Sequence, residues 1–306
     1  MKPLVQTNMP NLVHRGKVRD TYDLGGGLLL MVATDRISTF DVVHPTGIPC
    51  KGMALARLSA FWFRKTAHIV PNHFVGMADD PQMHERLKDN PVFKAMSPEI
   101  ARQAMVIRRA ERINIECVAR GYLAGSAWAE YQKSGTAFGQ PLPKGLLEAS
   151  KLPAPVFTPT TKAETGHDES MSYDQVVQMV GKELAARLQK TTLDIYSFGH
   201  DYALTRGIIL ADTKVEFGII NGHLALIDEL LTSDSSRFWD RSLYSPGQPP
   251  PSFDKQPVRD WGVAAGWNKQ PPAPALPAEV VAATTSRYLE AYRLLTGEKL
   301  IIEGDP

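Results

Sequence analysis

Alternating apolar and polar positions in the first third of the chain predict a sheet with one helix. Residues 18–23 and 28–33 have the pattern of two strands, and the three glycines of residues 25–27 are typical of a hairpin turn between them. Residues 55–69 carry apolar positions at helical spacing, and strand patterns return within residues 105–119. This part of the chain is therefore expected to be rich in β-structure.

Helical patterns are longer and more frequent in the rest of the chain. Helices are predicted over residues 125–133 and 279–295. A longer one is predicted from the N-capping residue Ser172 to about residue 206, broken once near Gly181. Strand runs followed by helices and a further hairpin predict an α+β fold rather than regular βαβ alternation.

A change in motif density and element length near residue 112 suggests two domains. We place an N-terminal β-rich domain at residues 1–112 and an α+β domain with C-terminal helices at residues 113–306, since the chain length also suggests about two domains. Residues 135–168 contain five prolines and almost no periodicity. Because structureless segments of this length are usually functional or disordered, we expect a functional loop there and a candidate lid.

Composition and charge exclude several classes of protein. The 306 residues are 43% hydrophobic and carry a net charge of +1, so no field over the whole surface attracts nucleic acid or membranes. The N-terminus lacks the apolar region of a signal peptide, and Cys50 and Cys117 form no disulfide framework or metal motif. We expect a cytoplasmic protein without nucleic-acid or membrane partners, in which any polyanion site is a local cluster of Arg and Lys.

Two segments combine glycine with cations, as phosphate sites do. Residues 15–19, with the sequence RGKVR, place a glycine between cations before the first strand. Residues 120–126 end a strand in Arg120 and open a helix at Ser126, where a hydroxyl and a helix N-terminus suit a phosphate. A solvated charged turn is the commoner explanation for the first segment, and a capped helix beside a structural arginine is the alternative for the second.

An acid–base–acid row marks a strand predicted over residues 208–217. Alternation places Asp212, Lys214 and Glu216 on one face of this strand. The strand that follows ends in Asp228. Carboxylates from neighbouring strands suit Mg²⁺, which prefers oxygen ligands and phosphates.

The Asn-Gly turn at residues 221–222 decides which side chain faces Glu216. A two-residue loop places Ile227 opposite Glu216, whereas a three-residue loop with a bulge at Gly222 places Asp228 there. Since a metal ion shared by Glu216 and Asp228 needs the second arrangement, we predict the bulged hairpin.

Two further polar segments are less specific. Residues 234–239 place serines and Arg237 beside aromatic residues, with Arg259 further on, and this pattern suits a sugar phosphate. Taken singly, a capped helix start is the commoner explanation. Residues 158–169 contain hydroxyls, charges and His167, and a lone histidine in such a loop is usually solvated. The residues alone thus indicate a Mg-dependent, phosphate-rich site assembled from distant segments, without a Walker loop or dinucleotide motif.

Seven short motifs follow one another between residues 15 and 261. They are RGKVRD, ATDRISTFD, RGYLAGSAW, FTPTTKAE with GHDE, DTKVEFG, DELLTSDSSRFW and SFDKQPVRDW. Each is moderately specific, but in this order they are very specific, and together they resemble the SAICAR synthetase family over nearly the whole chain. The loop lengths and total size are similar to those of the monomeric fungal-type enzymes, which implies a monomer.

The resemblance implies both a fold and a reaction. The fold would be α+β, with an N-terminal sheet domain similar to a kinase small lobe and an ATP-grasp-like second part. The reaction would be the ATP- and Mg²⁺-dependent ligation of carboxyaminoimidazole ribonucleotide to L-aspartate through an acyl phosphate, in purine biosynthesis. A small-molecule kinase, which needs the same apparatus, and a non-catalytic nucleotide-binding module are the alternatives.

The same resemblance implies roles for individual residues. Lys214, Asp212 and Lys162 would be catalytic, and Glu216 and Asp228 would hold Mg²⁺. ATP would be bound by Arg15, Gly16, Lys17, Val18, Arg19, Arg108, Lys162, Lys214, Glu216 and Asp228. The ribonucleotide would be bound by Arg120, Ser126, Asp212, Arg237 and Arg259, and L-aspartate by His167, Asp168 and Glu169. Backbone groups of residues 108–112 would flank the adenine.

Overall fold

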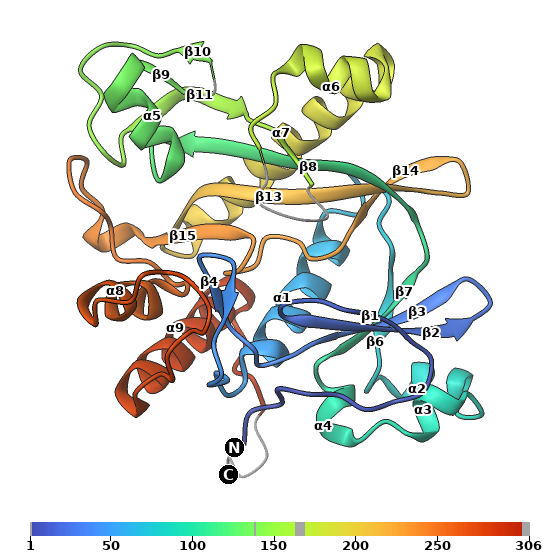
Figure 1. The fold of residues 1–306 in the computed structure, drawn as a ribbon. Coiled ribbons are helices and arrows are strands. Elements are labelled where there is room, and N and C mark those ends of the chain that lie inside the picture. Colours follow the sequence, from blue (N-terminus) through green and yellow to red (C-terminus); the bar gives the residue numbers. More distant parts are fainter. Residues whose placement is uncertain (1, 138, 163–168, 302–306) are drawn as a thin grey trace.

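Two antiparallel sheets form the framework of the protein (Figure 1). The computed structural model describes residues 2–137, 139–162 and 169–301. The first sheet has the strand order β1-β2-β3-β7-β6. Its strands are β1 (Leu12–Arg15), β2 (Arg19–Gly25), β3 (Leu28–Ala33), β6 (Phe74–Met77) and β7 (Ala104–Arg108). The hairpin predicted around residues 25–27 is confirmed as β2–β3, where three glycines with positive φ turn the chain.

The second sheet is built on two long strands, β8 (Glu111–Tyr122) and β13 (Ile208–Ile220). Its strand order is β11-β8-β13-β14, while β12 pairs with β8 and β15 pairs with β13. The shorter strands are β11 (Lys151–Phe157), β12 (Thr160–Thr161), β14 (His223–Ile227) and β15 (Ser236–Asp240). Residue 112, where we place the domain boundary, is the second residue of β8, at which the chain passes from the first sheet to the second.

Helices cover both sheets, and most follow the predicted pattern. The N-cap predicted at Ser172 is confirmed by a capping box, and Gly181 separates the two helices that follow. The helices α2 to α4 were not predicted, although each begins with proline after a capping Asp, Asn or Ser. The helices are α1 (Lys51–Lys65), α2 (Pro81–Leu87), α3 (Pro91–Lys94), α4 (Pro98–Ala101), α5 (Ser126–Ser134), α6 (Tyr173–Val180), α7 (Lys182–Thr205), α8 (Gln256–Ala264) and α9 (Ala278–Thr296), with one 3₁₀ turn, η1 (Arg241–Leu243).

The prediction that residues 135–168 form a structureless loop is wrong for the described part of this segment. β11 and β12 pair with β8, and β9 (Thr136–Ala137) pairs with β10 (Gln140–Pro141). Two of the prolines that suggested a loop lie within β11. Both lie between Lys151 and Val156, where the register with β8 shifts, so their missing N–H groups fall in an irregular stretch of an edge strand.

The predicted bulge in the hairpin at residues 221–222 is also wrong. The loop has two residues, so that Ile227 rather than Asp228 pairs with Glu216. Both loop residues have positive φ, the type I′ geometry whose twist matches that of the flanking strands. Asp228 therefore follows the last paired residue of β14, and its own backbone is left-handed, with φ of 64°.

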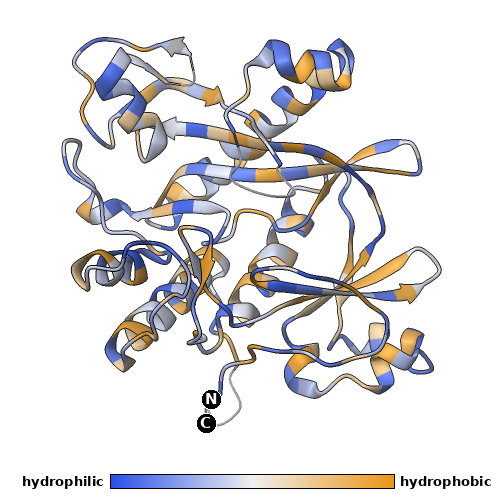
Figure 2. Cartoon of the chain, viewed as in Figure 1, coloured by the Kyte–Doolittle hydropathy of each residue, from blue (hydrophilic) through white to orange (hydrophobic). Residues whose placement is uncertain are grey.

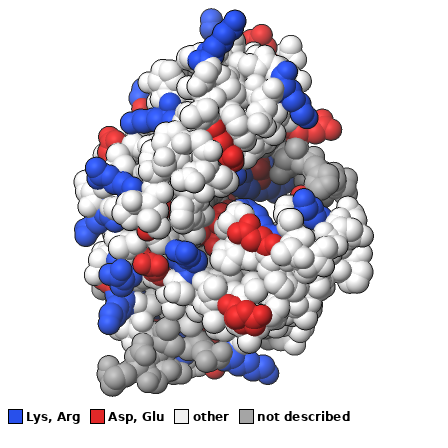
Figure 3. Space-filling model, turned by 90° about the vertical axis from the view of Figure 1, so that its left-hand side faces the viewer, with Lys and Arg blue, Asp and Glu red and all other residues white. Residues whose placement is uncertain are grey.

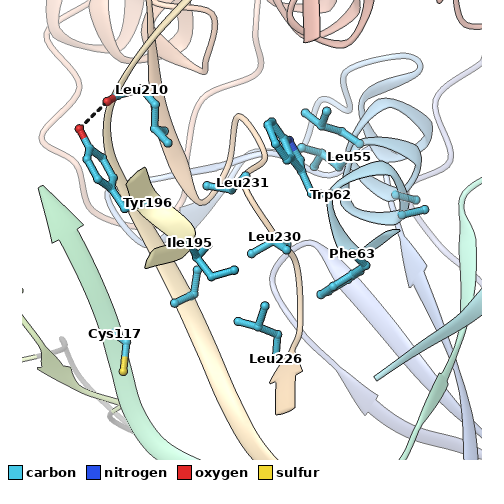
Figure 4. Packing of buried hydrophobic residues seen from close by; sticks show 14 of the residues in the cluster. Leu55, Trp62, Phe63, Cys117, Ile195, Tyr196, Leu210, Leu226, Leu230 and Leu231 are labelled. Carbon is cyan, nitrogen blue, oxygen red and sulfur yellow. Dashed lines mark hydrogen bonds between the residues drawn. The ribbon is translucent and has the colours of Figure 1, made fainter. Parts of the chain in front are cut away.

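One hydrophobic core extends from α1 into the second sheet (Figure 4). Trp62 and Phe63 of α1 are fully buried in the same cluster as Leu226 at β14. Further along, Tyr196 of α7 is buried and donates a hydrogen bond of 2.8 Å to the carbonyl oxygen of Leu210. Burying each side chain of this size stabilises the fold by about 1.5–3 kcal/mol, so the core fixes the two sheets relative to each other.

Backbone hydrogen bonds also join the segment before β6 to β14. The His73 N–H donates to the Leu226 carbonyl (3.0 Å), and the Leu226 N–H donates to the Pro71 carbonyl (2.9 Å). The end of β14, which Asp228 follows directly, is thereby tied to the first sheet. The helices mix hydrophobic and hydrophilic residues (Figure 2), and within the described ranges none is long and apolar enough to cross a membrane.

Candidate active site

Basic and acidic side chains line a hollow on one face of the molecule (Figure 3). The charged residues predicted from distant motifs come together in three groups, of which the first and third lie on the second sheet and the second lies where the two sheets meet. Each group takes at least one member from β13 or from residues 228–237, which comprise the loop between β14 and β15 and the first two residues of β15.

The first group, which we call the lysine–glutamate cluster, comprises Glu116, Lys162, Lys214 and Glu216. The antiparallel register places Glu116 of β8 opposite Glu216 of β13. The Lys214 ammonium donates to Glu116 Oε1 at 2.6 Å and lies 3.9 Å from Glu216 Oε1. Lys162 pairs with Glu216 and lies 3.7 Å from Glu116 Oε1. Two cations thus neutralise two carboxylates that would otherwise repel each other.

Glu116 is the member of this cluster that the motifs did not reveal. It is only 7% exposed, in the middle of a strand whose pattern predicts burial. Lys, Glu, Arg and Asp are almost never fully buried unless they are paired. The one available signal was a carboxylate within an apolar strand run, and this signal does not say which cation pairs with it.

The charges of the cluster shift its pKa values. Burial alone would lower the pKa of Lys214, but Glu116 and Glu216 outweigh it and raise that pKa above its ordinary value. Burial, together with the charge of Asp228, raises the pKa of Glu216 against the opposing effect of Lys162 and Lys214. Lys214 therefore stays cationic, and Glu216 gains from any further cation that approaches it.

The second group joins the two sheets through Arg19. Its guanidinium donates to both oxygens of Asp228, at 3.0 and 3.1 Å, and lies 2.5 Å from Glu229 Oε1. Burial would raise the pKa of Asp228, but Arg19, Lys162 and Lys214 lower it below its ordinary value. Asp228 is thus ionised, and its charge acts on Glu216 although the two residues are not strand partners.

Glu216 and Asp228 suit a magnesium ion by their chemistry. Both offer carboxylate oxygens, and Mg²⁺ is typically bound by one or two carboxylates together with substrate phosphates. Among the described residues, three His, Cys, Asp or Glu side chains do not converge in a way that could hold a metal ion without such phosphates. Strand pairing does not place Asp228 opposite Glu216, so the register that we expected a shared ion to need is not present. Asp228 instead follows the paired part of β14, and its charge still acts on Glu216, so a shared ion stays a proposal that no longer depends on that register.

The third group is an arginine pair around Asp212. The register places Asp212 opposite both Arg120 and Arg237. Each arginine donates to Asp212 Oδ2 at 2.9 Å, and Arg120 also donates to the Thr158 hydroxyl at 3.0 Å. Two guanidiniums against one carboxylate leave a net positive charge, as an anion site requires.

Gly125 brings this arginine pair to the start of α5. A Cβ at Gly125 would lie 2.8 Å from Arg237 Nη2, so the guanidinium packs directly on the glycine backbone. Its φ of 59° also favours glycine. Ser126 is the first residue of α5 and is exposed. A hydroxyl, a helix N-terminus and two guanidiniums therefore converge, which is a favourable arrangement for a phosphate.

The remaining predicted ATP and ribonucleotide residues lie outside the three charged groups or contact other partners. Lys17 is exposed and pairs with Asp41 at 2.6 Å, and Arg15 lies 3.6 Å from Asp20. Gly16 forms a tight turn by donating its N–H to the Arg19 carbonyl. The carbonyl of Val18 accepts from Thr34, the exposed Arg108 reaches the Asn72 carbonyl at 3.5 Å, and Arg259 pairs with Asp254 at 3.2 Å.

The segment predicted to bind L-aspartate is described only at its end. His167 and Asp168 lie outside the described residues. Glu169 is exposed, and its backbone N–H donates to the Thr161 hydroxyl at 3.0 Å.

A large groove on another part of the surface is not the candidate site. It encloses about 1040 Å³ along α9, and its lining is mostly apolar. It contains none of the residues of the three charged groups. Its lining includes Thr46, Pro49, Val281, Leu289, Arg293 and Lys299.

Comparison with known proteins identifies the family. The family model described as SAICAR synthetase matches residues 12–274. The chain belongs to the SAICAR synthetase family. A phosphoribosylaminoimidazole-succinocarboxamide synthase of Thioalkalivibrio sulfidiphilus is 50% identical over 300 residues, which cover 97% of this chain and 99% of that protein.

Solved SAICAR synthetase structures share the fold. The SAICAR synthase of Saccharomyces cerevisiae, complexed with SAICAR, superposes with a TM-score of 0.86 at 41% identity, over 98% of this chain and 99% of that one. A type-2 SAICAR synthetase structure in complex with ADP reaches a TM-score of 0.68 at 24% identity, over 94% of this chain and 99% of that one. The predicted α+β fold is thereby confirmed.

Membership of the SAICAR synthetase family also decides the class of activity. The chain is an ATP-dependent ligase of purine biosynthesis, as the motifs predicted, and not a small-molecule kinase or a non-catalytic nucleotide-binding module. The relative from Thioalkalivibrio sulfidiphilus and the structure from Saccharomyces cerevisiae both match this chain over nearly their full length. Total size therefore does not distinguish the fungal-type enzymes from this bacterial relative.

Proposed function

We propose that this chain is a monomeric cytoplasmic enzyme that joins carboxyaminoimidazole ribonucleotide to L-aspartate, with ATP, Mg²⁺ and an acyl-phosphate intermediate. One observation carries the proposal: Asp212, Lys214 and Glu216 alternate along β13, with the arginine pair at one end and the lysine–glutamate cluster at the other. Positions two residues apart on a strand are separated by about 6.8 Å. A phosphate bound by the arginines around Asp212 and a carboxylate bound near Lys214 can therefore belong to one nucleotide.

The arginine pair would hold the ribonucleotide phosphate. Arg120 and Arg237 supply guanidinium donors, and Ser126 with the first N–H groups of α5 completes the anion site. Asp212 holds both guanidiniums in place through the same carboxylate oxygen. Because that oxygen already accepts two charged donors, Asp212 serves better as a positioning residue than as the base that deprotonates L-aspartate.

The lysine–glutamate cluster would activate the ribonucleotide carboxylate. A carboxylate is a poor acyl electrophile, and transfer of the ATP γ-phosphoryl group converts its oxygen into a leaving group. Lys162 and Lys214 would stabilise the charge on the transferred group, since such transfer depends on positioning and cations. Glu216 and Asp228 would hold Mg²⁺, which would neutralise charge on the ATP phosphates. The amine of L-aspartate then attacks the acyl carbon and expels phosphate.

The first sheet would contribute the remaining ATP contacts. The segment of residues 15–19 faces the second sheet through Arg19, and Lys17 is exposed and able to leave Asp41 for a phosphate. Arg108 and the backbone at residues 108–112 would flank the adenine. The relative solved with ADP, which shares this fold, supports a nucleotide site in this architecture.

Arg259 and residues 167–169 would complete the binding of the ribonucleotide and of L-aspartate. Arg259 would grip the ribonucleotide only after leaving Asp254, its partner here. His167, Asp168 and Glu169 would bind L-aspartate at the end of the segment of residues 135–168, which would exclude water because acyl phosphates hydrolyse.

The proposal is tested by measuring ADP release from Mg-ATP and carboxyaminoimidazole ribonucleotide, with and without L-aspartate. We expect ADP release that depends on L-aspartate and equals the succinocarboxamide formed. ADP release at the same rate without L-aspartate, or no release at all, would contradict the proposed reaction.

A further inference from the structure

Residues 228–237, which comprise the loop after β14 and the first two residues of β15 and are called the active-site loop below, connect two of the charged groups described above. This loop begins at Asp228, which Arg19 holds, and ends at Arg237, which Asp212 holds. Whatever sets the shape of this loop therefore sets the distance between the candidate magnesium ligands and the candidate phosphate site. Asp234, near its middle, is gripped by side chains from opposite ends of the chain.

Two hydrogen bonds hold the Asp234 carboxylate. The Lys51 ammonium, from the first turn of α1, donates to Oδ2 at 2.6 Å. The Tyr288 hydroxyl, from the middle of α9, donates to Oδ1 at 2.6 Å. Lys255 lies 4.0 Å from Oδ1. Tyr288 is outside residues 12–274, over which the family model matches, so this contact joins a helix beyond the matched segment to the active-site loop.

The Asp234 junction is deeply buried. The side chain of Lys51 is 0% exposed and that of Asp234 is 6% exposed. Burial would raise the pKa of Asp234, but Lys51 and Lys255 outweigh it and hold that pKa below its ordinary range. A buried ion pair adds little net stability relative to apolar packing, so its role in conformational specificity is worth testing.

Hydrogen bonds inside the loop make it one unit around this junction. The Thr232 hydroxyl accepts from the N–H of Asp234 at 3.3 Å and itself donates to the Glu229 carboxylate. The Lys214 N–H donates to the Ser235 carbonyl at 2.8 Å. The metal side of the loop, its centre and β13 are thus connected without a gap.

We propose that Tyr288 and Lys51 act as positioning residues, which clamp Asp234 and thereby set both ends of the loop for Mg-ATP and ribonucleotide binding. Neither residue touches a substrate in this assignment. The inference rests on the proposed function for the identity of the two ligands, but the coupling itself can be measured by binding alone.

The test compares Tyr288→Phe with the control variant Tyr202→Phe. Tyr202 lies on α7, and its hydroxyl also ties α9 to the rest of the protein, by donating to the Leu295 carbonyl away from Asp234. We expect Tyr288→Phe to raise the KM values for both Mg-ATP and ribonucleotide by roughly 3- to 10-fold, since it removes one hydrogen bond to a charged group. Tyr202→Phe should leave both KM values unchanged at a similar loss in Tm. Unchanged KM values in Tyr288→Phe, or a change in only one of them, would overturn the proposal.

A binding measurement separates this inference from the proposed reaction. Titration of Mg-ADP into the Tyr288→Phe protein by calorimetry should show the same weakening relative to the wild type, even if turnover with L-aspartate is not observed. Asp234→Asn, which keeps the shape but removes the charge, should reproduce the effect. Wild-type affinity for Mg-ADP in both variants would refute the junction regardless of the reaction.

Discussion

Glu116 and Glu216 lie opposite each other on β8 and β13, although both are carboxylates and both are buried. Lys214 and Lys162 lie between them, each in contact with both. Like charges at paired positions destabilise a sheet, so this arrangement depends on the two lysines. It also orients the lysines, whose long side chains would otherwise have many rotamers.

Removing the charge of Glu116 tests this orientation. Glu116→Gln keeps the shape of the side chain but leaves Lys214 without its closest carboxylate. We expect the rate of ADP release at saturating substrates to fall by about tenfold or more, equivalent to about 1.4 kcal/mol or more in the barrier. The exposed Glu85, changed to Gln, is the control. Wild-type turnover in Glu116→Gln would show that the lysines do not need this carboxylate.

The carboxylates at residues 216 and 228 are expected to set the response to magnesium. Asp228→Asn should raise the Mg²⁺ concentration needed for half-maximal turnover, and Glu216→Gln should do the same, because each removes one anionic oxygen ligand. Chelation of Mg²⁺ by EDTA should abolish ADP release, and added Mg²⁺ should restore it. The assignment fails if the magnesium dependence of both variants matches that of the wild type.

Arg120→Ala should separate the two substrates. It removes a guanidinium from the candidate phosphate site, so ribonucleotide binding should weaken by about 1.5–3 kcal/mol, which is tenfold or more. ATP binding should be largely unaffected. Arg86→Ala, at an exposed position in the last turn of α2, serves as a control for the loss of a surface arginine. Equal weakening of both ligands would mean that Arg120 does not mark the ribonucleotide site.

The two ends of α5 allow a matched pair of glycine variants. Gly125 and Gly135 both have positive φ, but only at Gly125 would a Cβ meet another residue, Arg237. Alanine at either position should destabilise the protein by about 1–3 kcal/mol through backbone strain. Only Gly125→Ala should also weaken ribonucleotide binding, measured by titration calorimetry. A similar loss of affinity in Gly135→Ala would point to the helix rather than to the guanidinium.

Asp35 should make stability depend on pH. Burial, opposed by hydrogen bonds from the N–H groups of Gly52 and Leu4, raises the pKa of Asp35 to about 6. The folded state therefore holds this proton more tightly than the unfolded chain, and the resulting stability is present below about pH 4 and lost as pH rises through 6. Relative to the ordinary pKa of 3.8, this difference amounts to roughly 3 kcal/mol.

The contribution of Asp35 is measured as the difference in the free energy of unfolding between the wild type and Asp35→Asn. Urea unfolding of the wild type and Asp35→Asn at pH 4 and at pH 7 should show the wild type losing about 3 kcal/mol relative to the variant as pH rises. Asp79→Asn at a more exposed position controls for the general effect of charge. A difference between wild type and Asp35→Asn that does not vary with pH would contradict the shift.

Local sequence signals predicted most of the secondary structure. The hairpin β2–β3 and the capped start at Ser172 depend on residues a few positions apart, whose conformational preferences hold in any fold. The motifs likewise indicated β13 as the strand that carries the chemistry, because alternation alone puts Asp212, Lys214 and Glu216 on one face.

Where local signals allowed more than one outcome, the prediction failed. A bulged and an unbulged turn at Asn221-Gly222 are close alternatives, and the unbulged one matches the strand twist. The prolines of β11 are compatible with a loop or with an edge strand, and only the neighbouring β8 decides between the two.

The sequence by itself determined most of the elements, the family and the residue types of the site, because these follow from short-range patterns. Only the tertiary structure decided that Arg19 pairs with Asp228, that Glu116 joins two lysines, and that Tyr288 reaches Asp234. Arg19 and Asp228 are 209 positions apart in the chain. Such contacts depend on how two sheets and a terminal helix pack around one core, and no local preference of either partner specifies the other.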